Sequence, residues 1–479
     1  MMIFKKRNKM LSTHELCLKH TQDMVKKYTD AREPLFWSKD MLQEMRNKKL
    51  RDLLRYAKAN SPWYQKMLAD IDVNHFTEDQ LHEIPAMNKM TLMKHWDEVV
   101  TDRRLSLDMV ENHIEKMKNN GDTLYLLNSY HALATSGTSG KRCIYVYNWD
   151  EWIKFYLFTI RYSSRTNRQP VFSEFQNRKW KNAMIVISNA VYAMYSFAQT
   201  FKTTLFDQFY IPVTLPTDKI VEKLNYLQPD SLTGTPTTIS RLCHEPHIRN
   251  LHIRPKRILL SGEPLFPLLR KMIKTTWPDV HISNLYASSE GLFGVSCGAN
   301  PETHAMHLND DECIIQPVDE RGQPINKGVI PHKMYLTNLY LYTLPLIRYE
   351  YNDQLELLEK KCVCGVAHQL FAEPVGRPEY NFMYPGDVFV HHLVFVTPLL
   401  LEKNIQEYQV IQTERGVDIK ILSTGFINKN QLGTTIRDNL KALGLIDPEV
   451  TFSEVTQFEY TPAGKLHRFI KNKAYTDKI

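Results

Sequence analysis

The sequence lacks any apolar stretch long enough to cross a membrane. No window approaches the roughly 18 uninterrupted apolar residues that a transmembrane helix needs. The opening residues, Met1–Lys9, are basic, but neither the apolar core nor the small-residue cleavage site of a signal peptide follows them. We therefore expect a cytoplasmic protein that does not associate with membranes.

Cysteine and clustered positive charge are also scarce. Seven cysteines in 479 residues are few, and odd in number, for a disulfide scaffold of this size. A reducing compartment is the better interpretation, and clustered cysteines there indicate a metal site. The net charge of +7 is spread along the chain without a basic stripe interleaved with aromatic residues, so we expect no nucleic-acid partner. Anionic small molecules such as nucleotides or acyl groups suit this balance equally well.

What the sequence does contain is an alternation of strands and helices. With 43% hydrophobic residues over 479 positions, the chain can bury a large core, and its length predicts two or three domains. Helical spacing covers Met41–Ala59 and Asp218–Leu227, and apolar runs predict strands at Ala183–Ile187, Arg257–Ser261 and Val280–Tyr286. This alternation predicts an α/β fold with a largely parallel sheet, which would bind ligands beyond the carboxyl ends of its strands.

From about Val318 the sequence changes to β-rich segments separated by glycine and proline turns. A second change follows Gly376-Arg377-Pro378, which marks a boundary. The sequence therefore predicts a large N-terminal domain over residues 1–376, with mostly parallel sheets and a β-rich subdomain. A small α+β C-terminal domain would cover residues 377–479.

A loop rich in glycine and hydroxyl residues, Leu133–Arg142, precedes a run that is typical of a strand. Glycine lets backbone N–H groups face a ligand, and successive inward-facing amides form an anion-binding concavity. The loop is not of the GxxxxGK[ST] type, because Thr135 stands at the first glycine and Arg142 at the magnesium-binding hydroxyl. A plain flexible turn is the alternative. The candidate phosphate-binding residues are Thr135, Ser136, Gly137, Thr138, Ser139, Gly140 and Lys141.

Several short blocks follow one another in a set order. They are Ala134–Gly140, Gly234-Thr-Pro-Thr237, Ser261-Gly-Glu-Pro264, Asn284–Gly291, Pro345–Asp353, Gly376-Arg377 and Pro462-Ala-Gly-Lys465. In this series the chain resembles the adenylate-forming superfamily of acyl-CoA synthetases, adenylation domains and luciferases, over about residues 40–470. The likeness is greatest to the phenylacetate–CoA ligase-like branch, which includes deazaflavin-coenzyme-adenylating synthetase-like and capsule-biosynthesis-like proteins. That branch is indicated by Leu54–Tyr64, Thr337-Asn-Leu339 and Cys362-Val-Cys-Gly365.

The resemblance implies an enzyme in which a carboxylate attacks the α-phosphate of ATP, giving an acyl adenylate and pyrophosphate. That reaction needs charge neutralised on the triphosphate, the nucleoside held, and the carboxylate aimed in line. The resemblance also implies that the small domain is mobile and carries a catalytic lysine.

Two acids receive roles from the resemblance. Glu290 takes the glutamate position of the family's Tyr-x-x-Thr-Glu motif and would hold Mg²⁺. Asp353 takes the aspartate position of the Arg-Tyr-x-Thr-Gly-Asp motif and would accept hydrogen bonds from the ribose, although Tyr351-Asn352 here replaces Thr-Gly. The alternatives are a helix N-terminal acid for Glu290 and a solvated turn acid for Asp353.

Other nucleotide-binding residues follow from the same matches. Arg377 would contribute to the nucleotide site at the domain boundary, with a surface linker arginine as the alternative. The residues that would bind the rest of the nucleotide, including the adenine, are Ser261, Gly262, Glu263, Pro264, Asn284, Tyr286, Ala287, Ser288 and Ser289.

Lys465 matches the catalytic lysine of the family. A lysine after Pro-Ala-Gly on a loop can bring a point charge into a cleft, where it would bridge the carboxylate and the α-phosphate. An isolated lysine near a C-terminus is otherwise a solvated surface residue. The hypothesis is that Lys465 stabilises the charge that develops in the transition state.

A cysteine pair gives a second, independent signal. Cys362 and Cys364 are separated by one residue, a shorter gap than the usual CxxC spacing, and Cys297 and His307 lie upstream. Structural zinc takes four such sulfur and nitrogen ligands. Some phenylacetate–CoA ligase-like proteins resemble this layout with bound zinc. His304 is the rival ligand, because an insertion separates Cys297 from His307.

The match to the family is weaker at the hinge about which the small domain would rotate for thioester formation. Tyr380 occupies the position of the usual hinge aspartate.

The acyl acceptor is therefore left open. The first interpretation is an acyl- or aryl-CoA ligase, and the alternative is an enzyme that passes the acyl group to an amine, alcohol or carrier-protein thiol. A third hypothesis is a degenerate nucleotide-binding protein. Aromatic residues in Val191–Phe197 suit an aryl or other apolar acid. Expected ligands are ATP, Mg²⁺, a small carboxylic acid, structural Zn²⁺ and CoA as a co-substrate, and a homodimer stays open.

Overall fold

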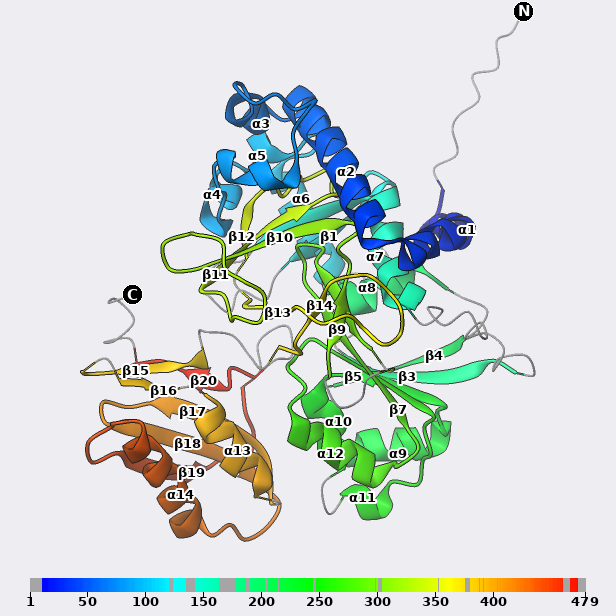
Figure 1. Ribbon diagram of the computed structural model, residues 1–479. Coiled ribbons are helices and arrows are strands. Elements are labelled where there is room, and N and C mark those ends of the chain that lie inside the picture. The colour runs from blue at the N-terminus through cyan, green and yellow to red at the C-terminus, as the bar shows by residue number, and fades with distance from the viewer. Residues whose placement is uncertain are drawn as a thin grey trace, which may run out of the picture.

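The computed structural model describes most of the chain, and Figure 1 shows how its parts are arranged. The described residues are 11–119, 124–134, 143–162, 178–186, 190–202, 206–213, 215–243, 247–297, 299, 304–351, 353–374, 380–386, 388–390, 392–402, 404–459 and 466–472. We call residues 11–374 the large unit and residues 380–472 the small unit.

The chain begins with a group of helices, blue in Figure 1. Each of the two long helices starts at a serine cap: Ser12 Oγ accepts from the Glu15 N–H, and Ser38 Oγ accepts from the Met41 N–H. The helix predicted over 41–59 is confirmed and is longer by a few residues. The elements are α1 (Thr13–Arg32), η1 (Glu33–Phe36), α2 (Lys39–Asn60), α3 (Pro62–Met67), η2 (Glu78–Glu83), α4 (Lys89–Lys94), α5 (Trp96–Val99) and α6 (Leu107–Asn119).

A β-hairpin follows, and it leads into a buried helix. Strands β1 (Tyr130–Ala134) and β2 (Ile144–Asn148) pair antiparallel and are buried along nearly their whole length. Asn148 caps α7 (Trp149–Arg161) by accepting from two backbone N–H groups of its first turn. This hairpin places the two sides of the predicted phosphate loop next to each other.

A nine-stranded mixed sheet forms the centre of the large unit. Its strand order is β13-β14-β9-β8-β7-β6-β5-β3-β4. The bounds are β3 (Trp180–Val186), β4 (Phe206–Pro212), β5 (Ser231–Gly234), β6 (Arg257–Ser261), β7 (His281–Ala287), β8 (Phe293–Ser296), β9 (Met306–Leu308), β13 (Leu357–Leu358) and β14 (Leu370–Phe371).

One half of this sheet is parallel and the other is antiparallel. Strands β4, β3, β5, β6 and β7 run parallel, as the strand–helix alternation predicts. The direction reverses at β8, because the short connection from β7 can only form a hairpin. The helices of this half are α8 (Ala193–Thr200), α9 (Thr217–Leu227), α10 (Pro236–Leu242), α11 (His247–Asn250) and α12 (Pro267–Thr276).

The β-rich texture after Val318 belongs to a second, smaller sheet and its surroundings. Three antiparallel strands form it, in the order β10-β11-β12. Their bounds are β10 (Cys313–Val318), β11 (Lys333–Asn338) and β12 (Tyr349–Tyr351). The predicted combination of an α/β fold with a β-rich part is therefore confirmed.

The small unit has its own sheets and its own hydrophobic core, at the lower left of Figure 1. Its four-stranded sheet has the order β19-β18-β17-β20, and β15 pairs with β16. The elements are β15 (Phe382–Tyr384), β16 (Val388–Val390), α13 (Leu393–Leu401), β17 (Ile405–Gln412), β18 (Gly416–Ser423), α14 (Lys429–Ala442), β19 (Glu449–Glu454) and β20 (Phe469–Ile470). The predicted boundary at Gly376-Arg377 lies outside the described residues and stays a prediction.

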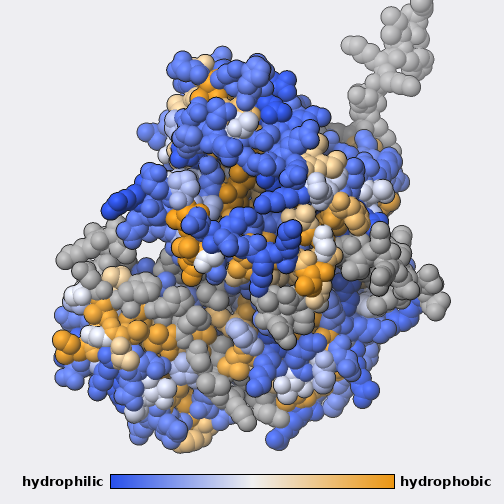
Figure 2. All heavy atoms as spheres, in the orientation of Figure 1, coloured by the Kyte–Doolittle hydropathy of each residue, from blue (hydrophilic) through white to orange (hydrophobic). Residues whose placement is uncertain are grey.

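The surface seen in Figure 2 is mostly hydrophilic, and apolar side chains gather in places on the small unit. Among the described helices, none combines the length and the apolar character that a membrane crossing requires. All seven cysteines are free thiols.

Candidate active site and metal centre

The carboxyl ends of three neighbouring parallel strands meet at one edge of the large sheet. β5 ends at Gly234, β6 at Ser261 and β7 at Ala287. The register pairs Gly234 with Leu260 and Ser261 with Leu285, so these ends lie side by side. Three of the blocks singled out in the sequence therefore lie at this edge, where open α/β sheets bind ligands.

The predicted phosphate loop is the connection between β1 and β2. Ala134 pairs with Ile144 at the end of the ladder next to this loop. The loop residues Thr135–Lys141 lie outside the described residues, so their role stays a prediction. The strand that follows them reaches the turn that carries Glu290, as the next contacts show.

Glu290 lies in the short turn between β7 and β8. The Ser288 N–H donates to the Leu292 carbonyl at 3.0 Å, and the Gly291 N–H donates to the Ser288 carbonyl at 3.0 Å. Gly291 has a φ of +82°, and a Cβ there would lie 2.5 Å from the Asn338 amide nitrogen. Glycine is required at this position, because any side chain would be both strained and crowded.

Two tyrosines of β2 hold this turn in place. The Tyr145 hydroxyl donates to Glu290 Oε1 at 2.9 Å, and the Tyr147 hydroxyl donates to the Ser289 carbonyl at 2.5 Å. Asn338 Nδ2 donates to the Glu290 carbonyl at 2.9 Å. Burial raises the pKa of Tyr145 and of Tyr147 well above the usual value, so both hydroxyls stay protonated donors. The carboxylate is thus fixed beside the strand that follows the predicted phosphate loop.

Asp353 is held by a tyrosine pair. The Tyr286 hydroxyl donates to Asp353 Oδ2 at 2.7 Å, and the Tyr286 and Tyr351 hydroxyls are 2.5 Å apart. Burial raises the pKa of both tyrosines well above the usual value. Tyr351 stands where the family motif has threonine. Both residues carry a hydroxyl, but the longer tyrosine side chain brings its hydroxyl to Tyr286 on β7. Asn352 lies outside the described residues.

The block after β6 is tied to the block after β5. Gly262 has a φ of +86°, in the left-handed region that favours glycine. Glu263 Oε2 accepts from the Thr237 N–H at 3.1 Å, in the first turn of α10. A carboxylate is well placed there, because the first N–H groups of a helix lack partners within the helix.

Asn284, a predicted nucleotide-binding residue, is buried in the structure, and its role stays a prediction. Its side chain is 4% exposed, and its Nδ2 donates to Glu373 Oε1 at 2.9 Å. Arg270 forms an ion pair with the same carboxylate at 2.6 Å. Tyr286 lies two residues further along β7, on the same face of the strand as Asn284.

Three cysteines and one histidine converge at the far end of β8 and β9. One ligand atom from each of Cys297, His307, Cys362 and Cys364 lies within 4.8 Å of all the others. Cys297 Sγ is 3.3 Å from Cys362 Sγ, and Cys364 Sγ is 3.2 Å from His307 Nε2. The rival ligand His304 does not belong to this group among the described residues. Three sulfurs and one imidazole nitrogen are a donor set typical of structural zinc.

Two predicted site residues cannot be placed. Arg377 and Lys465 both lie outside the described residues, so their roles stay predictions. The described chain resumes at Leu466, directly after the predicted catalytic lysine.

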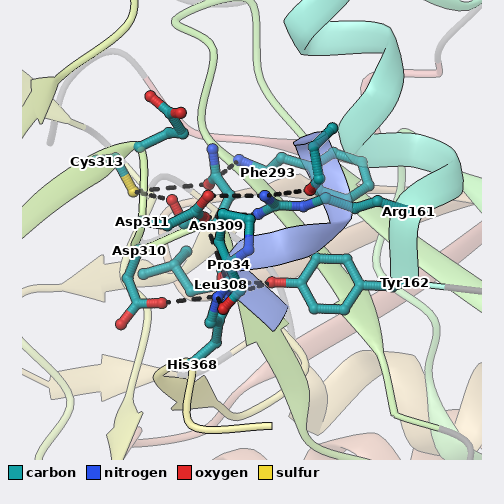
Figure 3. Close-up of polar contacts among 12 residues, drawn as sticks. Pro34, Arg161, Tyr162, Phe293, Leu308, Asn309, Asp310, Asp311, Cys313 and His368 are labelled. Carbon is teal, nitrogen blue, oxygen red and sulfur yellow. Dashed lines mark hydrogen bonds and ion pairs between the residues drawn. The ribbon is translucent and has the colours of Figure 1, made fainter. Parts of the chain in front are cut away.

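A buried ion network was not predicted from the sequence. Arg161 makes two hydrogen bonds to the Asp311 carboxylate, at 2.6 and 2.7 Å, and both side chains are 1% exposed (Figure 3). Tyr162 and His368 lie beside this pair, 2.6 Å apart, and His368 Nε2 donates to the Pro34 carbonyl at 3.0 Å. Burial acts to raise the pKa of Asp311, but the Arg161 charge and hydrogen bonds lower it below its usual range.

A mixed sheet with a separate small unit is the arrangement that this chain shares with solved acyl-CoA ligase structures. No family model matches the chain. The relatives and structural neighbours that this chain is similar to all belong to the adenylate-forming superfamily.

Two curated relatives and one solved structure illustrate this placement. Protein CapK of Staphylococcus aureus is 20% identical over 465 residues, which cover 95% of this chain and 93% of CapK. A phenylacetate-coenzyme A ligase of Thermus thermophilus is 24% identical over 207 residues, 42% of this chain and 46% of that protein.

The solved structure is a 2-hydroxyisobutyryl-CoA ligase in its postadenylation state, in complex with R3-HIB-AMP. It superposes with a TM-score of 0.66 at 13% identity, over 92% of this chain and 91% of that one. In the thioesterification state of the same ligase the TM-score is 0.52 at nearly equal coverage.

Proposed function

We propose that the protein is an ATP- and magnesium-dependent enzyme that activates a carboxylic acid as an acyl adenylate and then transfers the acyl group to CoA. The observation that carries this proposal is the placement of Glu290 and Asp353. Both carboxylates are held by tyrosine hydroxyls next to the carboxyl edge of the parallel strands. Two fixed acids at the carboxyl edge of parallel strands suit one cation and one ribose.

The first half-reaction follows from these assignments. A carboxylate oxygen of the substrate attacks the α-phosphorus of ATP, a new P–O bond forms, and the bond to the β-phosphate oxygen breaks to release pyrophosphate. Glu290 would hold Mg²⁺, which neutralises phosphate charge when bound. Asp353 would orient the ribose, Thr135–Lys141 would bind the triphosphate, and Lys465 would stabilise the charge at the α-phosphate.

An acceptor other than CoA is the second candidate. The specific observation is Tyr380, which takes the hinge position and packs into the small unit. Its ring centroid lies 5.7 Å from that of His392 and 5.6 Å from that of Phe469. By the resemblance this is the hinge position, and an aromatic side chain packed there would alter the rotation that thioester formation needs. An amine, an alcohol or a carrier-protein thiol would then receive the acyl group.

The decisive experiment is carboxylate-dependent ATP–pyrophosphate exchange with a panel of aryl, short-chain and branched acids. Exchange with at least one acid class supports the proposal. Adding CoA, an amine or a carrier protein to a pyrophosphate-release assay then separates the two acceptor classes. If no acid supports exchange while ATP still binds, the protein is a nucleotide-binding protein without adenylation activity.

We also propose structural zinc at Cys297, His307, Cys362 and Cys364. The support is the convergence of one ligand atom from each residue within 4.8 Å. Zinc there would cross-link β8, β9 and the loop that contains the cysteine pair, and it would take no part in the reaction. Free thiolates of this kind need a reducing compartment, in line with the cytoplasmic location expected from the sequence.

A further inference from the structure

The small unit contacts the large unit through Arg468, three residues after Lys465. Arg468 Nη2 donates to Thr237 Oγ1 on α10 at 2.9 Å. Its Nη1 donates to the Tyr408 carbonyl on β17 at 3.3 Å, and its guanidinium carbon lies 4.8 Å from the centre of the Tyr408 ring. The side chain is thus braced on the small unit while its tip reaches the large unit.

A buried carboxylate lies between arginines of the two units. Glu407 on β17 is 2% exposed, and Arg468 and Arg241 approach it to 4.0 and 3.8 Å. Arg241 belongs to α10 in the large unit, where it also donates to Thr217 Oγ1 at 3.0 Å. A buried carboxylate is costly without positive partners, so this pairing favours the arrangement in which α10 and β17 stay together.

The segment around Arg468 is held firmly on the small unit. Its own carbonyl accepts from the Val410 N–H at 2.7 Å, and the His467 carbonyl accepts from Gln409 Nε2 at 2.8 Å. Phe469 pairs with Val410 in the parallel ladder of β20 and β17. The backbone that carries Arg468 is therefore part of the small unit and moves with β17.

The position of this contact is next to the candidate nucleotide site. Thr237, which accepts from Arg468, also donates its backbone N–H to Glu263. Three residues of chain span at most about 11 Å, so Lys465 cannot lie far from the point where Arg468 is anchored. The anchor point of Arg468 is therefore at the edge where the nucleotide would bind.

We propose that Arg468 is a positioning residue that docks the small unit on α10 and so places Lys465 for adenylation. This inference rests on the proposed function. Arg468 itself contacts no reacting atom: it acts through Thr237 on one side and Glu407 on the other. The contact must open before the small unit can turn to any other orientation.

The kinetic test compares adenylation with acyl transfer. Arg468→Ala should lower the kcat of ATP–pyrophosphate exchange by about 10- to 100-fold, because small misplacements of a catalytic group are costly. The KM for ATP should change by less than about 3-fold, since ground-state binding is kept. Transfer from a chemically prepared acyl adenylate should change by less than about 3-fold, because that step does not need the contact.

Two further variants make the test specific. Arg468→Lys should recover part of the exchange rate, because lysine keeps the charge but not the two-pronged geometry. Thr237→Val removes the acceptor without altering the small unit, and its effect should not add to that of Arg468→Ala. The control is Arg415→Ala, which breaks an exposed ion pair with Glu449 in the same unit and should leave exchange within about 2-fold. Equal losses in exchange and transfer, or equal losses in the control, would overturn the proposal.

A measurement without substrate separates this inference from the proposed function. Fluorophores can be attached through non-natural amino acids at Tyr226 in the large unit and Phe426 in the small unit, which are 88% and 86% exposed. Resonance energy transfer between the two fluorophores then reports the distance between the units. The wild type should give one narrow distribution of energy-transfer efficiency, and Arg468→Ala should give a broad one. If no acid supports exchange in the wild type, the proposed function fails and this readout still decides the role of Arg468. An unchanged distribution contradicts it.

Discussion

At the scale of single residues, the candidate site depends on groups far apart in the sequence. Glu290 and Asp353 are candidates from the sequence because they occur in ordered blocks, and their roles stay predictions. Their supports could not be predicted, because Tyr145 is 145 positions from Glu290 and Tyr286 is 67 positions from Asp353. Contacts between residues so far apart in the sequence depend on the order of the strands in the sheet. The spacing of residues along the sequence does not reveal that order.

Lys465 gives the sharpest residue-level prediction. Lys465→Ala should lower ATP–pyrophosphate exchange by about 10²- to 10³-fold, the usual cost of removing a charge that stabilises a transition state. ATP affinity, measured by calorimetry, should stay within about 3-fold, because the lysine acts only as charge develops. Lys441→Ala, on an exposed position of α14, is the control. Unchanged carboxylate-dependent exchange in Lys465→Ala would exclude the assigned role.

A buried histidine cluster beside β1 predicts sensitivity to acid. His131 is 0% exposed, and among the described residues neither of its ring nitrogens has a hydrogen-bond partner. Burial lowers the pKa of His131 well below the usual value, and burial lowers the pKa of His20 and of His113 to about 4. The unfolded chain, with a histidine pKa of about 6.5, therefore binds more protons than the folded chain between about pH 6.5 and 4. Stability present above pH 6.5 is lost as the pH falls through this window.

The variant His131→Phe tests that cause. Phenylalanine keeps a planar ring against Trp152, whose ring centroid lies 4.6 Å away. The free energy of unfolding should fall less steeply with acid than in the wild type, by about 1.4 kcal/mol per pH unit for one histidine. Urea unfolding at pH 7.5, 6.5 and 5.5 measures the slope. Parallel slopes for the two proteins would assign the acid sensitivity to other groups.

At the scale of elements, the buried ion pair joins α7 to the connection between β9 and β10. Arg161→Met should destabilise the large unit by about 3–5 kcal/mol, because it leaves the Asp311 charge buried without a partner. Adding Asp311→Leu should restore much of the loss, since the stranded charge is removed with it. Urea unfolding measures both variants.

The control is Lys219→Met, which breaks the surface ion pair with Glu222. The two side chains are 65% and 69% exposed, so the free energy of unfolding should change by less than about 1 kcal/mol. A similar loss in Arg161→Met and this control would contradict the explanation.

The cysteine–histidine cluster also acts between elements. Metal analysis of protein purified without chelators should find about one zinc per chain, because one set of four ligands binds one ion. The pair Cys362→Ser and Cys364→Ser should lose that zinc and lower the melting temperature. Cys243→Ser, a free thiol outside the cluster, should do neither. Equal zinc in all three proteins, or none in the wild type, would remove the site.

The choice between His304 and His307 shows the limit of prediction at this scale. Spacing from Cys297 left both open. The ladder settles the geometry, because His307 pairs with Val295 in β8 and Leu370 in β14, between two strands. Strands β6 and β7 could be predicted, because each is an apolar run in the sequence. The reversal of strand direction at β8 could not, because it depends on the turn at Gly291, and the sequence does not distinguish this glycine from others.

At the scale of the whole molecule, the relation between the two units decides which step of a reaction can occur. The separate core of the small unit could be predicted from the change of texture near Gly376. Its orientation could not, because the contact between Arg468 and Thr237 spans 231 positions and the hinge position carries an unexpected residue.

Tyr380→Asp tests the hinge. Replacing the anchored ring by the acid of the family pattern should raise acyl transfer to CoA by about 10-fold, because rotation no longer has to break an aromatic contact. Exchange should stay within about 3-fold, since the adenylation residues are untouched. Tyr380→Phe keeps the ring and should match the wild type, and thermal melting checks that each variant folds. A loss of both steps in Tyr380→Asp would mean that the ring serves folding alone.

The N-terminal helix α1 lies at the edge of the ribbon in Figure 1, yet two buried donors depend on its last turn and on η1, which follows it. Arg161 Nη1 donates to the Ala31 carbonyl at 3.4 Å, and His368 Nε2 donates to the Pro34 carbonyl at 3.0 Å. A truncated protein starting at α2 would leave His368 Nε2 without this acceptor, at a cost of about 1–3 kcal/mol for a buried unpaired donor, whereas Arg161 Nη1 would keep its hydrogen bond to Asp311. Shortened versions made for crystallisation or fusion should therefore keep the chain from Ser12 onward, because its first helix closes the core of the large unit.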